Sequence, residues 1–127
     1  IIVGTYALSA GYYDAYYHRA QQVRGLMAAE FESAFKEYDA VLSPTSPVVA
    51  FRLGEITDPM QLKLLDLCTI PANMGGFPSI SLPCGLAHDL PVGLQLTGPV
   101  MGDENLLSLS YAVDKALDRD YRRPPIL

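Results

Sequence analysis

Asp66 is the side chain best suited to chemistry, because it is the only charged residue in the apolar stretch from Leu64 to Ile70. If this carboxylate is buried, it needs a cation or several hydrogen-bond donors, since an unpaired buried charge is costly. If it lies on the solvent-facing side of a helix, it needs no partner. The pattern of residue types alone leaves both alternatives open.

Two other groups have the residue types of catalytic sites but not the surroundings. His88 stands beside Asp89, as a base stands beside its orienting acid, but both lie in a polar segment where we expect a solvent-exposed turn. Cys84 has no base or cation adjacent in sequence, and a thiol needs such a neighbour to become a nucleophile. We therefore expect a structural role for Cys84.

The segment from Ser43 to Pro47 places three hydroxyl groups after a short apolar run, on Ser43, Thr45 and Ser46. Ligands often bind where a strand of an α/β sheet ends, but proline-rich segments of this kind are more often rigid turns. None of the three hydroxyls has a base adjacent in sequence, so we nominate none of them as a nucleophile.

Metal, nucleotide and nucleic-acid sites are not indicated. The possible metal ligands have no spacing that would place two of them on one element: His18, Cys68, Cys84 and His88. Gly75-Gly76 lacks the Lys and the Ser or Thr that follow the glycines of a phosphate-binding loop. The net charge of −5 is the wrong sign for a protein that neutralises phosphates. We expect no metal, no cofactor and no direct contact with nucleic acid.

The hydrophobic pattern predicts an α/β fold in which helices cover a segment of mixed β-sheet. Apolar residues occupy every second position in two short runs, Ile80 and Leu82 in the first and Val92, Leu94 and Leu96 in the second. A period of two is typical of half-buried strands. Apolar residues at steps of three and four predict amphipathic helices. We expect a long helix at about 12–38, strands at about 39–43, 79–83 and 92–97, and helices at about 59–69 and 103–117. The length of the connection at 85–91 fits a hairpin or a short crossing loop.

The composition predicts a cytoplasmic segment that meets further protein. Half of the residues are hydrophobic and 18% are charged, against about a quarter charged in typical soluble domains. No apolar run approaches the roughly 18 residues of a membrane span, and no signal peptide is visible. The two cysteines give no disulfide framework, which fits a reducing compartment. Because the first residue is Ile1 and not Met, we expect the natural start to lie elsewhere.

Two longer motifs make the chain resemble the amidase signature family. One runs from Thr69 to Gly85 and on from Leu90 to Pro99 (TIPANMGGFPSISLPCG and LPVGLQLTGP), and the other is GTYALSAGYYDAYY at residues 4–17. The resemblance covers the chain to about Leu117, and it is strongest to the family's glutamine-hydrolysing subunits, which serve the amidation of Glu-tRNA(Gln). It implies that residues 1–127 are a C-terminal fragment of the amidase domain, with the same α/β fold.

The resemblance also implies what the residues of this chain do. Asp66 falls on the acidic position that contacts the amino group of the substrate glutamine, and the loop from Thr69 to Gly76 is expected to shape the pocket. The family's catalytic serine and lysine lie upstream, in a Gly- and Ser-rich segment that is absent here. We therefore expect no catalytic residue in this chain and no activity of the chain in isolation.

Partner subunits complete the reaction that the resemblance implies. A serine attacks the side-chain amide of glutamine, and the ammonia released passes to a B subunit, which uses ATP and Mg²⁺ to amidate Glu-tRNA(Gln). A C subunit holds the A and B subunits together. Two alternatives stay open. One is an amidase for small or apolar amides, which an apolar residue in place of Asp66 would have favoured. The other is a non-catalytic interaction module on the same scaffold.

Overall fold

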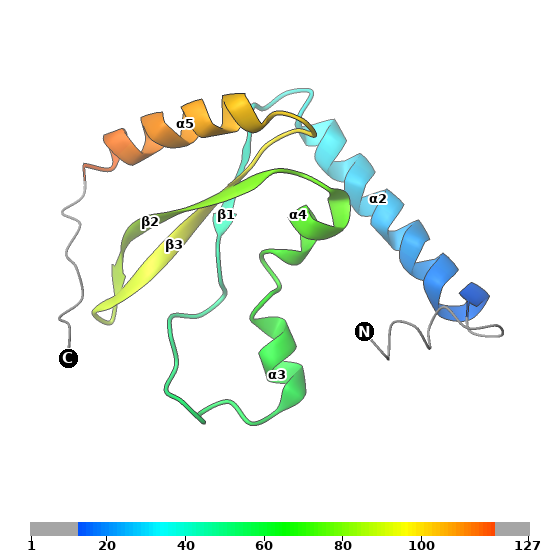
Figure 1. Ribbon diagram of the computed structural model, residues 1–127, viewed down its shortest axis with the longest axis horizontal. Coiled ribbons are helices and arrows are strands. Elements are labelled where there is room, and N and C mark those ends of the chain that lie inside the picture. The colour runs from blue at the N-terminus through cyan, green and yellow to red at the C-terminus, as the bar shows by residue number, and fades with distance from the viewer. Residues whose placement is uncertain (1–12, 119–127) are drawn as a thin grey trace.

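The computed structural model describes residues 13–118, with side chains from residue 16 onward. Its elements, in chain order, are the π-helix η1 (Tyr13–His18), α2 (Arg19–Ala34), β1 (Val41–Pro44), α3 (Pro59–Leu64), α4 (Ile70–Gly75), β2 (Ser79–Ala87), β3 (Leu90–Thr97) and α5 (Asp103–Ala116) (Figure 1). The long helix predicted at 12–38 corresponds to η1 and α2, and it ends earlier, at Ala34. Most of the motif at residues 4–17 lies outside the described residues.

The strands form one sheet in the order β1-β3-β2, so β3 is its central strand. Both neighbours pair with β3 in antiparallel fashion, and Val41 of β1 and Ser79 of β2 both lie opposite Thr97. The predicted α/β class is confirmed. The mixed pairing expected for this segment is not formed within the described residues. β1 and β2 run in the same direction but lie on opposite edges of β3, where they cannot pair with each other.

β2 and β3 form a hairpin whose turn is much shorter than the expected connection at 85–91. The turn consists of His88 and Asp89, with φ angles of 52° and 62°. A two-residue turn with both φ angles positive is the type I′ form, whose twist matches that of the flanking strands. Both side chains are exposed at the tip of the hairpin, as the sequence predicts.

A β-bulge makes both strands of the hairpin longer than predicted. Pro83 pairs with Gly93, but the next pair joins Gly85 to Val92, which leaves Cys84 as the extra residue. The ladder then continues as far as the turn. Proline and glycine are typical of a strand end, and the prediction ends β2 at residue 83 for that reason.

The single helix predicted at 59–69 is wrong, because α3 and α4 are separated by a turn at residues 65–69. Pro71 accounts for the break: inside a continuous helix its ring would clash with the carbonyl four residues earlier. Near the start of a new helix the same proline causes no such clash. α4 ends at Gly76, whose φ of 77° forms a left-handed cap. The segment from Thr69 to Gly76 is therefore a helix and not the loop that we expected.

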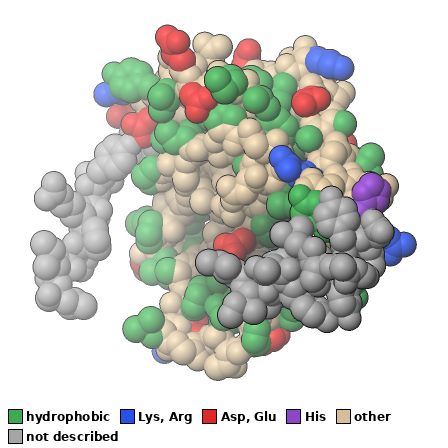
Figure 2. Space-filling model, turned by 45° about the vertical axis from the view of Figure 1, so that its right-hand side comes forward, with side chains coloured by type: hydrophobic (Ala, Val, Ile, Leu, Met, Phe, Trp, Pro, Cys, Tyr) green, Lys and Arg blue, Asp and Glu red, His purple; other side chains and the backbone are tan. Residues whose placement is uncertain are grey.

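α5 lies along the sheet and contacts β2 and β3, whereas α2 packs against α4 near the start of β2 (Figure 1). Few apolar side chains are buried, and the most enclosed are Ala72, Phe77, Leu96 and Leu106, at 3–6% exposure. α2 buries none of its residues, and hydrophobic side chains are open over much of the face drawn in Figure 2. Exposed apolar surface of this extent is typical of a face that meets further protein.

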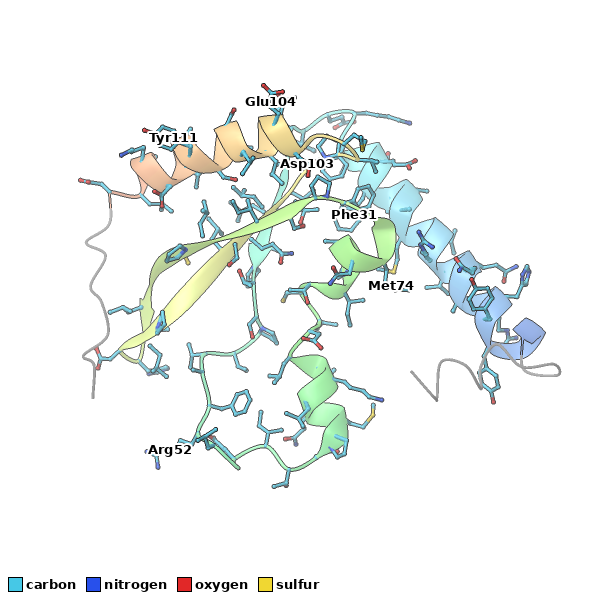
Figure 3. The ribbon with its side chains drawn as sticks, viewed as in Figure 1. Phe31, Arg52, Met74, Asp103, Glu104 and Tyr111 are labelled. Atoms are coloured by element: carbon cyan, nitrogen blue, oxygen red, sulfur yellow. The ribbon has the colours of Figure 1, made fainter. Side chains whose placement is uncertain are left out.

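Phe77 links α2 to the start of β2. Its ring stacks on Phe31 at 5.3 Å between centroids and meets Phe35 edge-on at 5.4 Å. A second link is the hydrogen bond from Arg24 Nε to the carbonyl oxygen of Met74, at 2.6 Å. Phe31 and Met74 lie where α2 and α4 meet (Figure 3). These contacts fix α4, and with it the turn that precedes α4, relative to α2.

None of the described helices is long and apolar enough to cross a membrane.

Candidate substrate-binding site

Asp66 lies in the turn between α3 and α4 (Figure 1). Its backbone carbonyl accepts hydrogen bonds from the amides of Thr69, at 3.0 Å, and Ile70, at 2.9 Å. The Thr69 hydroxyl donates to the same oxygen at 3.1 Å. The carbonyl of Asp66 thus helps to start α4, and the carboxylate is held on the outside of a defined turn.

The side chain of Asp66 is exposed. Of the two alternatives that the sequence leaves open, the structure therefore favours the solvent-facing one, although the residue lies in a turn and not on a helix. Among the described residues the carboxylate has no hydrogen-bonding or ionic partner. An exposed carboxylate without a partner is available to a cationic group of a ligand.

Gln95 connects this turn to the centre of the sheet. Its Nε2 donates a hydrogen bond of 2.9 Å to the carbonyl oxygen of Cys68, and its side chain is only 5% exposed. Gln95 belongs to β3, where it pairs with Ser43 on one side and Ser81 on the other. Gln95 is not among the residues predicted from the sequence, because nothing in the local pattern shows what its side chain contacts.

One face of the sheet is lined with polar side chains. Residues two apart on a strand share a face, and the alternation places five such residues together: Ser43, Ser79, Ser81, Gln95 and Thr97. The hydroxyls of Ser79 and Thr97 lie 2.8 Å apart. The sequence contains a signal for this face, because Ser81 lies between Ile80 and Leu82, and Gln95 lies between Leu94 and Leu96. The strands are predicted from the apolar residues of this alternation and not from the polar ones.

A cleft of about 440 Å³ adjoins the turn that carries Asp66. Its walls are the loop after β1, the hairpin and Leu65, the neighbour of Asp66. The lining is mainly apolar, with Val48, Phe51 and Val92 among its residues, and Thr45 and Ser46 supply hydroxyls. The cleft can therefore accept an aliphatic or aromatic group. Asp66 is not among the lining residues, and its neighbour Leu65 joins the turn to the cleft.

Ser43 and Pro44 belong to β1, so only the part of the predicted turn from Thr45 onward leaves the strand, and hydrogen bonds hold that part. Thr45 Oγ1 and Ser81 Oγ lie 2.6 Å apart, and the amide of Val48 donates to Ser46 Oγ at 3.5 Å. The Thr45 and Ser81 hydroxyls meet over Gly93, where a Cβ atom would lie 2.7 Å from the first and 2.9 Å from the second. Gly93 thus leaves the space in which this pair forms.

Gly93→Ala is expected to lower the stability by about 1–3 kcal/mol, because the new methyl group forces the Thr45 and Ser81 hydroxyls apart. The matched control is Gly25→Ala in α2, where the added methyl meets no atom within 4 Å. Alanine is favoured over glycine in a helix by about 1 kcal/mol, so the control should be neutral or stabilising. Urea unfolding measures both, and an unchanged midpoint for Gly93→Ala would contradict the close packing at this position.

The two cysteines and a metal site are the remaining candidates. Cys84 is the extra residue of the bulge, and it and Cys68 are both free thiols. Across residues 13–118 no three His, Cys, Asp or Glu side chains come together in a way that could hold a metal ion.

Comparison with known proteins identifies the class to which this fold and site belong. Residues 1–107 match the protein family described as Amidase, and the chain belongs to that family. The crystal structure of the glutamyl-tRNA(Gln) amidotransferase A subunit from Thermotoga maritima superposes with a TM-score of 0.81 and 43% identity, over 96% of this chain and 26% of that one. A bacterial aryl acylamidase of the amidase signature family superposes with a TM-score of 0.64 and 27% identity, over 76% of this chain and 22% of that one.

Within the amidase family, the chain is similar to the A subunits of glutamyl-tRNA(Gln) amidotransferase. The one from Desulforamulus reducens is 54% identical over 127 residues, which is 99% of this chain and 26% of the relative. The chain thus spans about a quarter of the length of the curated relatives that it matches. The expected resemblance and fold class are confirmed.

Proposed function

We propose that the 127 residues form the C-terminal part of a subunit that hydrolyses glutamine and supplies ammonia for the conversion of Glu-tRNA(Gln) to Gln-tRNA(Gln). The observation that carries the proposal is Asp66, an exposed carboxylate without a partner among the described residues, in a turn whose Leu65 lines a mainly apolar cleft. The similarity to subunits of that name, at 54% identity over 99% of the chain, supports it.

The chemistry of glutamine suits this arrangement. Its α-amino group is a cation at neutral pH, and a charge-assisted hydrogen bond to a carboxylate is about twice as strong as a neutral one. Asp66 would bind this ammonium group and so select an amino acid over a simple amide. The side-chain amide would extend to the catalytic serine and lysine, which in this proposal lie upstream of the described residues.

The subunit would work with partners in the cytoplasm. A B subunit would amidate Glu-tRNA(Gln) with ATP and Mg²⁺, and a C subunit would hold the complex together. In this proposal ATP and Mg²⁺ are used by the B subunit. The net charge of −5 favours contact with tRNA through the partner and not through this segment.

Substrate discrimination tests the proposal. Glutaramate is glutamine without its amino group, so the complete subunit is expected to show a KM for glutaramate about tenfold to hundredfold above that for glutamine, as loss of a charged hydrogen bond predicts. Hydrolysis is measured as ammonia release with the complete complex. Equal KM values for the two substrates would contradict a site for the amino group.

A general amidase is the second candidate. The mainly apolar lining of the cleft, with Val48 and Phe51, favours it, as does the similarity of fold to an aryl acylamidase. Such an enzyme would hydrolyse anilides and small apolar amides at least as well as glutamine. Arylamine release from anilides and ammonia release from small primary amides, each compared with ammonia release from glutamine, separate the two functions.

A further inference from the structure

The geometry points to Gln95 as the positioning residue of the substrate site: its buried side chain sets the place of the Asp66 carboxylate through the carbonyl oxygen of Cys68. This inference rests on the proposed role of Asp66 and adds a residue that contacts no substrate. It begins from the way in which the turn at 65–69 is held. The amides of Leu65, Asp66 and Leu67 reach only the carbonyls three residues earlier, at 3.2–3.3 Å, and the shorter hydrogen bonds all converge on the carbonyl of Asp66.

Gln95 adds a hydrogen bond from the sheet to this turn. It donates to Cys68 O at 2.9 Å across 27 residues of sequence. Because a carbonyl oxygen only accepts hydrogen bonds, this contact also fixes which way the Gln95 amide points. Cys68 stands two residues after Asp66, so any shift of its carbonyl moves the turn that carries the carboxylate.

The other end of this link is rigid. β3 is paired on both edges at the level of Gln95, with Ser43 of β1 and Ser81 of β2. The side chain is 5% exposed and borders a cavity of about 150 Å³ between the sheet and α4. A long side chain buried this deeply on a central strand has little freedom to move. Gln95 therefore transmits the position of the sheet to the turn.

The test compares the complete complex with Gln95→Met, which keeps the length and apolar volume of the side chain but cannot donate. Loss of this part-buried hydrogen bond frees the Cys68 carbonyl, and we expect a rise of about tenfold in the KM for glutamine. We expect kcat to change by less than about twofold and the KM for glutaramate to stay unchanged, because glutaramate has no group for Asp66 to bind. Activity with added ammonia, which bypasses glutamine hydrolysis, should be unaffected.

Thr97→Val is the matched control, because Thr97 lies on the same face of β3, is 3% exposed and also loses a buried hydrogen bond, to Ser79. Thr97→Val should leave unchanged the KM for glutaramate divided by the KM for glutamine. If Thr97→Val lowers this ratio as Gln95→Met does, or if Gln95→Met raises both KM values equally, general loosening of the sheet explains the effect and the inference is wrong.

A second variant keeps the inference testable if Gln95→Met folds poorly. In Gln95→Glu the introduced carboxyl can donate an O–H to Cys68 O only while protonated, and burial raises the pKa of such a group. In this variant the KM for glutaramate divided by the KM for glutamine should rise as the pH falls from about 8 to about 6. The unmodified complex should show no such trend. A ratio in this variant that equals that of the unmodified complex at every pH would overturn the inference.

The outcomes also separate this inference from the proposed function. If the unmodified complex distinguishes glutamine from glutaramate but Gln95→Met does so equally well, only the role of Gln95 is wrong. If the unmodified complex does not distinguish the two substrates, the proposed site for the amino group fails, and the positioning role fails with it.

Discussion

Asp66→Asn in the complete complex that we propose is expected to raise the KM for glutamine by about tenfold to hundredfold, since a hydrogen bond to a charged group contributes about 1.5–3 kcal/mol. Asparagine keeps the shape of the side chain, removes its charge and replaces one acceptor oxygen with an NH2 donor. The turn should be preserved, because the contacts that start α4 are made by the backbone carbonyl of Asp66 and not by its carboxylate. The KM for glutaramate should be almost unchanged.

Ammonia release at varied glutamine concentration measures this effect. Asp58→Asn is the matched control: Asp58 Oδ1 accepts from the amide of Met60 at 3.0 Å as the N-cap of α3, and asparagine caps helices equally well. The control should leave both KM values and tRNA binding unchanged. An unaltered KM for glutamine in Asp66→Asn would remove Asp66 from the site. An equal rise for glutaramate would show that the residue shapes the pocket without binding the amino group.

The strands were predictable from local pattern, whereas their ends were not. The alternation around Ile80 and Leu94 is a property of neighbouring residues, and both strands form where it occurs. The bulge at Cys84 and the turn at His88 depend on how one strand pairs with the other. Pairing is decided across the sheet, so a proline and a glycine that are typical of a strand end can instead lie inside a continuous ladder.

The candidate site divides in the same way. Asp66 stood out because its charge interrupts an apolar run, but its exposure depends on the break before α4, which Pro71 imposes and the apolar pattern conceals. Gln95 could not be predicted, because its partner Cys68 is far away in sequence. A hydrogen bond of that range requires the position of the turn over the sheet. The role of Asp66 in substrate binding stays a prediction.

The largest expected loss of stability comes from Phe77→Ala, at about 3–5 kcal/mol, the usual cost of removing a buried aromatic ring. Phe77 is 6% exposed and contacts Phe31 and Phe35 of the α2 segment at centroid distances of 5.3 and 5.4 Å. Its ring also occupies the space beside Gly75, in the last turn of α4. Removing the ring therefore opens a cavity at the point where α2, α4 and the start of β2 meet.

Hydrogen exchange locates this loss, and urea unfolding measures its size. In Phe77→Ala the amides of α2 and α4 should exchange faster. The amides of α5 from residue 110 onward serve as an internal reference, because the start of α5 lies near Phe35 whereas its later turns run away from α2 (Figure 1). Phe77→Leu keeps an apolar group in the same space and should cost about 1.5 kcal/mol or less, as volume-conserving changes do. If alanine and leucine destabilise equally, or if exchange in α5 rises as much as in α2, the aromatic cluster does not join these elements. Because α4 follows the Asp66 turn directly, the same variant should also weaken glutamine binding, and this links the packing of α2 to the substrate site.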